Sequence, residues 1–141
     1  MKLISILSLF IFLFISISIN SQQKDEYDIK AVFVKYSPEK ITLNNPVIFT
    51  YRIENCGKKE IPAKSYDVEF YIDNKLVNSD YATKKLKVVK GIVEYSTQGD
   101  SRYIPKKLGK HTYKLIVDPK NRLKEVTKTN NVIEGSFVVE K

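Results

Sequence analysis

Large apolar residues recur at every second position along most of the chain beyond residue 27. Residues 47–54 give the clearest case, in which the large apolar side chains are Val47, Phe49, Tyr51 and Ile53. Residues 66–72 repeat this alternation. Because successive side chains of a β-strand point to opposite faces, the period of two predicts strands with one packed face and one wetter face.

Seven strands are predicted in this way, and turns rich in Gly, Pro, Asn and Asp separate them at intervals of about ten residues. They cover residues 28–35, 47–54, 66–72, a short edge strand around Leu76 and Val77, 91–97, 111–117 and 132–139. The spacing predicts an all-β fold, an Ig-like antiparallel β-sandwich of about seven strands, with Phe49 and Phe70 in its interior.

Two interruptions of the pattern carry their own predictions. Gly135 breaks the last strand, which predicts a β-bulge at that position. The stretch 118–131 contains Thr127, Thr129 and Asn130, which are poor helix formers, so we expect an irregular loop there.

The first part of the chain differs from the rest, because Lys2 precedes an almost unbroken apolar run from Leu3 to Ile19. A short positive start and an apolar core are typical of a secretory signal peptide, and we expect this segment to be helical. The small Ser21 fits the residue before the cleavage point, which makes Gln22 the expected new N-terminus. The run is slightly shorter than the roughly 20 residues of a membrane span, and an uncleaved membrane anchor is the alternative.

The predicted organisation is therefore a signal peptide at 1–21, a polar segment at 22–26 and one domain at 27–141, in a protein that is secreted or held at the cell surface. The chain has 141 residues, so a second catalytic domain does not fit. One cysteine cannot form an internal disulfide, and one histidine argues against a multi-histidine metal centre. No catalytic signature surrounds His111, Ser96, Ser101 or Cys56. We predict no catalytic residue, no enzyme activity and no cofactor.

Several motifs along residues 27–139 share one family pattern. They are Tyr27-Asp28-Ile29, the strand 47–53 followed by Glu54-Asn55-Cys56-Gly57, the strand 68–73, and the segment 109–119 followed by Asn121, Glu125, Asn130 and Asn131. In these motifs the chain resembles the CARDB family, cell-adhesion-related domains found mainly in bacterial surface proteins. The resemblance implies an Ig-like seven-stranded sandwich, adhesion or binding outside the cell, and no catalysis. One residue departs from the pattern, since Lys128 stands where the family usually has a second acid.

The loop 118–131 contains residues that could hold a cation. Calcium prefers six or more oxygen ligands, and the candidates are Asp118, Asn121, Glu125, Asn130 and Asn131. The alternative is turn chemistry, in which these side chains bond loop amides. Because only two carboxylates lie among Lys120, Arg122, Lys124 and Lys128, we predict that no metal is bound.

Lysines and tyrosines supply the other binding candidates. The basic clusters are Lys84, Lys85, Lys87 and Lys90, then Lys106, Lys107 and Lys110, and the formal net charge is +8. They could attract an anionic ligand, or form a solvated face that protects strand edges from self-pairing. Exposed aromatic rings stack on sugars, and the candidates by strand position or nearness to turns are Tyr71, Tyr81, Tyr95 and Tyr103. Tyr51, Tyr66 and Tyr113 are predicted to be core residues.

The sequence therefore predicts a secreted, non-catalytic Ig-like binding or adhesion module. Its expected partner is an extracellular protein or polysaccharide, including an anionic one. No nucleic-acid motif occurs, so nucleic acid is not an expected partner, and membrane contact is expected only through an uncleaved leader. The alternative is a structural assembly unit that pairs through edge strands near Leu76 and Phe137 or through a Cys56 disulfide. Otherwise Cys56 is expected to be a partly buried, unreactive thiol.

Overall fold

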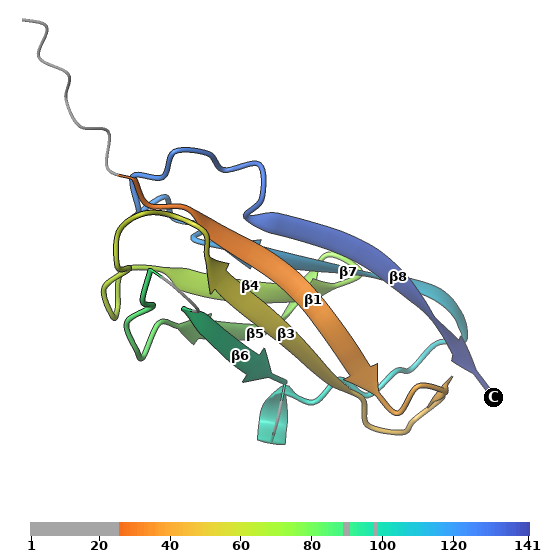
Figure 1. Cartoon of the computed structure of the whole chain (residues 1–141). Helices are drawn as coiled ribbons and strands as arrows, with labels where there is room; N and C mark the ends of the chain where they lie inside the picture. The colour runs from red at the N-terminus through yellow and green to blue at the C-terminus, as the bar shows by residue number, and fades with distance from the viewer. Residues whose placement is uncertain (1–25, 89–90, 98) are drawn as a thin grey trace, which may run out of the picture.

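Two sheets, antiparallel except for one short parallel pair, pack face to face in the computed structural model of this chain (Figure 1). The structure describes residues 26–88, 91–97 and 99–141. The predicted signal peptide, the cleavage point at Ser21 and Gln22, and Lys90 lie outside the described residues. Among the described residues, no helix is long and apolar enough to span a membrane.

The first sheet has three strands in the order β1-β3-β6, and the second has five in the order β2-β8-β7-β4-β5. Their bounds, with one short 3₁₀ helix, are β1 (Ile29–Ser37), β2 (Ile41–Thr42), β3 (Ile48–Asn55), β4 (Asp67–Ile72), β5 (Lys75–Tyr81), β6 (Ile92–Ser96), η1 (Gly99–Ser101), β7 (Gly109–Val117) and β8 (Val132–Glu140). The predicted all-β sandwich is confirmed, and each of the seven predicted strands is present with slightly different ends.

Strand β2 was not expected from the sequence. It pairs in parallel with the end of β8, through Ile41 with Val139 and Thr42 with Glu140. A strand of two residues is too short to show an alternating pattern, so periodicity could not reveal it.

The interior is built by the predicted alternation. Side chains of β3 and β4 alternate between buried and half-buried along the whole of each strand. Phe49 and Phe70 are both 0% exposed, with ring centroids 5.1 Å apart across the two sheets, as the sequence predicted. Tyr51 and Tyr66 are also 0% exposed. Burial of these rings is the main source of stability in a sandwich without a disulfide.

The predicted bulge at Gly135 is wrong. Gly135 pairs directly with Tyr113 in an unbroken β7–β8 ladder. The ring of Tyr113 covers the glycine so closely that a Cβ at this position would lie 2.2 Å from the tyrosine oxygen. The absence of a side chain at Gly135 therefore leaves space for the ring of Tyr113 on the neighbouring strand. The irregularities of the ladders lie instead between Phe33 and Lys35 in β1 and between Phe70 and Tyr71 in β4.

Both predicted edge strands lie at an edge of the five-stranded sheet for most of their length. β5 is an edge strand of the five-stranded sheet. β8 has β7 on one side, and on its other side β2 pairs only with Val139 and Glu140, so within the described residues the stretch around Phe137 remains an edge as predicted.

Candidate functional site

Two polar regions lie at opposite ends of β7. His111 stands near the start of this strand, and Asp118 follows its last residue. In Figure 1 the loop between β7 and β8 lies at the end of the sandwich where β1 begins, and the segment that leads into β7 lies at the other end. We call residues 118–131 the closing loop.

Asp118 organises the first half of the closing loop. Its side chain is 0% exposed. Its Oδ1 accepts the backbone N–H of Arg122 at 2.9 Å, and its Oδ2 accepts that of Leu123 at 3.0 Å. Asp118 has a φ of 51°, a left-handed conformation that Asp tolerates better than most residues. The side chain therefore stabilises a tight turn directly after β7.

Glu125 ties the closing loop to the first strand. Its side chain is also 0% exposed. Its Oε2 accepts the backbone N–H of Ile29 at 3.0 Å, and its Oε1 accepts the Asn131 amide at 2.8 Å. The same Asn131 amide group donates to the Val117 carbonyl at 3.2 Å. Glu125 thus connects β1 with the ends of β7 and β8.

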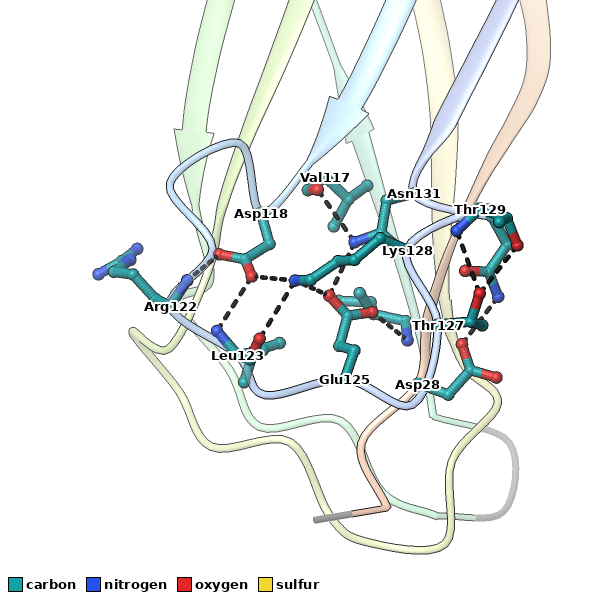
Figure 2. Close-up of polar contacts among 12 residues, drawn as sticks. Asp28, Val117, Asp118, Arg122, Leu123, Glu125, Thr127, Lys128, Thr129 and Asn131 are labelled. Atoms are coloured by element: carbon teal, nitrogen blue, oxygen red, sulfur yellow. Dashed lines mark hydrogen bonds and ion pairs between the residues drawn. The ribbon is translucent and has the colours of Figure 1, made fainter. Parts of the chain in front are cut away.

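The ammonium of Lys128 lies between these two carboxylates (Figure 2). Nζ donates to Asp118 Oδ2 at 2.8 Å, to the Leu123 carbonyl at 3.1 Å and to Glu125 Oε1. Desolvation by itself lowers the pKa of Lys128, but the hydrogen bonds and charges of Asp118 and Glu125 raise it more. The net effect holds the pKa above its usual value, so the ammonium stays charged.

The closing loop brings together only part of the predicted calcium set. Asp118, Glu125 and Asn131 meet around Lys128. Asn130 instead donates to Asp28 Oδ1 at 2.7 Å, and Asn121 is exposed in a left-handed turn. Within the described residues, no group of three or more His, Cys, Asp and Glu side chains is placed to hold a metal ion.

A cavity of about 390 Å³ opens at the opposite end of β7. We call it the lysine pocket; its lining is apolar at Ile72, Val77, Tyr103 and Ile104, basic at Lys75, Lys106 and Lys107, and completed by Asp73 and His111. Three segments meet here, namely the β4–β5 hairpin, the stretch 103–107 and the start of β7.

Hydrogen bonds fix the inner wall of the lysine pocket. His111 Nδ1 lies 2.6 Å from Asp73 Oδ2, and Nε2 lies 2.9 Å from the Lys107 carbonyl. Asp73 Oδ1 also accepts the backbone N–H of Thr112 at 2.9 Å. Burial by itself raises the pKa of Asp73, but the Thr112 and His111 hydrogen bonds lower it more, so the net pKa is below the usual value. Each ring nitrogen of His111 already faces an acceptor, which leaves neither free to activate a nucleophile.

The basic wall of the pocket is exposed. Lys75, Lys106 and Lys107 are all exposed. Lys106 donates to the neutral Asn44 side-chain oxygen at 3.3 Å. In the part of the chain that the structure describes, none of the three forms an ion pair. A neighbouring cavity of about 400 Å³ against β7 and β8 differs, because its Lys114 is paired with Glu134 at 2.6 Å.

The other tyrosine candidates lie outside the lysine pocket. Tyr95 was expected on the outer face, which is wrong, because it pairs with Tyr51 across β3 and β6 and stacks on it at 5.8 Å on the inner face. Tyr71 is half-buried and donates to Glu69 at 2.6 Å. Tyr81 is 57% exposed at the end of β5.

The remaining lysine candidates, Lys84, Lys85 and Lys87, are exposed beyond β5. Of the predicted ligand residues, Tyr103, Lys106 and Lys107 come together in one cavity, the lysine pocket.

Cys56 is exposed, so the expectation of a partly buried thiol is wrong. Partial desolvation and the charges of Asp28 and Glu54 nevertheless raise the pKa of the thiol, which lowers its thiolate fraction at neutral pH.

Sequence reasoning missed Lys75, Asp73, His111 and Ile104 as parts of one pocket. Asp73 and Lys75 lie between two predicted strands, residues 66–72 and the short strand around Leu76 and Val77, in a connection to which no binding role was given. No sequence signal associated that connection with residues about 30 positions further along the chain.

Comparison with known proteins supplies the family and the fold. Residues 28–135 match the family model described as CARDB. One similar solved structure is a crystal structure of the CARDB domain of a Pyrococcus furiosus protein in complex with di-metal ions. It has a TM-score of 0.59 at 19% sequence identity, and the match covers 81% of this chain and 94% of that domain. A solution structure of the same domain gives the same TM-score and identity, with 81% and 95% covered.

A domain from Methanosarcina acetivorans, named as a cell surface protein, has a TM-score of 0.54 at 20% identity and covers 79% of this chain and 92% of its own. No curated protein matches this chain. At these identities the structural matches establish the fold.

Proposed function

Since the chain belongs to the CARDB family of cell-adhesion-related domains, we propose that it is a secreted, non-catalytic module that binds an acidic polysaccharide at the lysine pocket. The observation that carries this proposal is the combination of three exposed lysines, without ion pairs in the described residues, around an apolar wall. The single carboxylate of the pocket, Asp73, is already bonded to His111 and Thr112. The pocket therefore presents net positive charge.

The apolar wall favours a sugar ring over a simple anion. The Tyr103 ring is held edge-on against Phe49 at 6.4 Å and Phe137 at 6.0 Å, so its position is fixed before any ligand arrives. Ile104 beside it is 43% exposed. A rigid aromatic ring with an exposed aliphatic neighbour can pack on the apolar face of a pyranose, while ammonium groups meet its carboxylates.

The same geometry supports a binding role over an enzymatic one. Both ring nitrogens of His111 are bonded to acceptors, and the hydroxyl of Tyr103 has a pKa raised by burial and then by the charge of Asp73. The ring nitrogens of His111 are therefore already engaged, and the Tyr103 hydroxyl stays protonated at neutral pH.

No metal forms part of the proposed function. The Pyrococcus furiosus domain was solved with di-metal ions. The closing loop of this chain does not fit such a centre, because its two buried carboxylates are already bound to the Lys128 ammonium.

The test is the affinity for polygalacturonate, a uronic acid polymer, by calorimetry at two salt concentrations. We expect Lys106→Ala/Lys107→Ala to weaken binding about tenfold, equivalent to about 1.4 kcal/mol. Alanine retains the Lys107 carbonyl that bonds His111. The matched control is Lys84→Ala/Lys87→Ala, which removes the same charge from another exposed segment and should change the affinity less than about twofold.

Three results would contradict the proposal. Equal loss in both double variants would mean diffuse charge attraction. Binding of neutral dextran as strong as that of polygalacturonate would remove the role of the lysines. Equal binding of polyglutamate would point to an acidic protein partner.

A second candidate is self-assembly. β5 is an edge strand with Leu76 and Tyr81 exposed at 53% and 57%, and Cys56 is exposed. These features favour strand pairing or a disulfide between two copies.

A further inference from the structure

Two carboxylates with no exposed surface lie in the closing loop within reach of one nitrogen atom. Asp118 and Glu125 side chains are both 0% exposed, and each has an oxygen bonded to Lys128 Nζ. Two desolvated carboxylates this close repel each other strongly unless a positive charge lies between them. A cation at this point removes the repulsion and keeps both carboxylates ionised.

The ammonium supplies this cation. It has three protons, and three oxygens accept them, from Asp118, Glu125 and the Leu123 carbonyl (Figure 2). Two carboxylate oxygens and one backbone carbonyl are also the ligands that a hard divalent cation prefers. We infer that Lys128 is the built-in cation of the closing loop, occupying the place of a metal ion, and that this chain holds the loop without bound metal.

Burial separates this contact from the surface ion pairs of the same protein. In the pairs Lys40–Glu140 and Lys114–Glu134 the carboxylate side chains are 54% and 63% exposed. Such carboxylates remain hydrated when the lysine is removed, and the pairs contribute little. Asp118 and Glu125 have no such alternative, because their other oxygens are bonded to backbone amides of Arg122 and Ile29.

The site is also open to solvent on the lysine side. The Lys128 side chain is 38% exposed. If its charge is removed and the carboxylates are kept, a divalent cation can reach the three oxygens and complete its coordination with water. We therefore expect Lys128→Met to create a calcium site, with a Kd on the order of 10⁻⁴ to 10⁻³ M as in weak extracellular sites.

The experiment measures melting temperature in EDTA and in 10 mM calcium chloride, together with calcium binding by calorimetry. Wild type should show no binding and no shift. Lys128→Met should melt lower than wild type in EDTA and gain about 5 °C or more with calcium. Lys124→Met is the matched control, because Lys124 is an exposed lysine of the same loop, and it should behave like wild type. Lys128→Met/Glu125→Gln should lose most of the calcium response, since one ligand charge is gone.

Calcium binding by wild type at this affinity would overturn the inference, because the ammonium would then not fill the site. A Lys128→Met variant that is destabilised without any calcium response would overturn it as well. If Lys128→Met does not fold in EDTA, two measurements decide the question: refolding of Lys128→Met in calcium, and folding of Lys128→Met/Glu125→Gln, in which the repulsion between the two carboxylates is removed. Failure of both to restore the fold would contradict the assigned role. None of these outcomes depends on the ligand of the lysine pocket, which is at the other end of β7.

Discussion

Substituting Gly135 with alanine tests whether the glycine is needed because the Tyr113 ring packs directly on it. The new Cβ would lie 2.2 Å from the Tyr113 hydroxyl oxygen, 2.3 Å from Cζ and 2.7 Å from Cε1. These distances are far below van der Waals contact, so the ring would have to move. The ring is stacked on Phe33 at 4.4 Å and packs against the core, so it cannot move without losing those contacts.

The expected cost follows from three contributions. Forcing extra volume into a packed site costs about 1–3 kcal/mol, and disturbing an aromatic pair costs about 0.5–1.5 kcal/mol. Replacing glycine by alanine in a strand regains roughly 0.5–1 kcal/mol. The sum predicts a loss of about 0.5–4 kcal/mol in the free energy of unfolding, centred near 2 kcal/mol, which is a large part of the roughly 5–15 kcal/mol typical of a domain.

Urea denaturation followed by far-UV circular dichroism measures this loss, and a double-mutant cycle assigns its cause. In a Tyr113→Ala background the clash is absent, so Gly135→Ala should be neutral or slightly stabilising. Ser136→Ala, at the exposed neighbouring position, should change stability by less than about 0.5 kcal/mol. An equal cost of Gly135→Ala with and without the Tyr113 ring would refute the reasoning, because the glycine would then be needed for its backbone alone.

Two further predictions concern titratable groups. The net pKa of Asp73 is lowered in the folded state, so its ionised form stabilises the fold above about pH 4 and this contribution is lost as the pH falls through the folded pKa. Asp73→Asn should therefore be less stable than wild type at pH 7, with a gap that narrows below pH 4; a gap independent of pH contradicts the pairing. Cys56 should react fully with Ellman's reagent in the native protein, but more slowly at pH 7 than free cysteine because its pKa is raised. If the thiol reacts only after unfolding, Cys56 is not exposed as described. A dimer that light scattering detects and that a reductant dissociates into monomers would support the self-assembly candidate.

The alternation of apolar and polar side chains was sufficient to predict the fold. Phe49 and Phe70 were predicted to be interior residues from their neighbours in sequence, and both are fully buried. Strand periodicity is a local property, because it reflects which face of one strand each side chain joins. The motifs along the chain likewise indicated the CARDB family, and the family model confirms it.

The failures come from contacts between strands. The alternation placed Tyr95 on the outer face, although its pairing with Tyr51 puts it inside. Gly135 carried the signal of a bulge, although the cross-strand Tyr113 ring explains it. A sequence shows neither the register between strands nor the side chain that fills the space above a glycine.

Only the tertiary structure decided how the charges are used. The sequence showed that Lys128 stands where the family usually has an acidic residue. Its bonds to Asp118 and Glu125, however, depend on the path of the closing loop. Glu125 reaches Ile29, 96 positions away, and the lysine pocket joins three separate segments. Electrostatic interactions depend on distance in space and on access of water, and an irregular loop has no period from which either can be inferred.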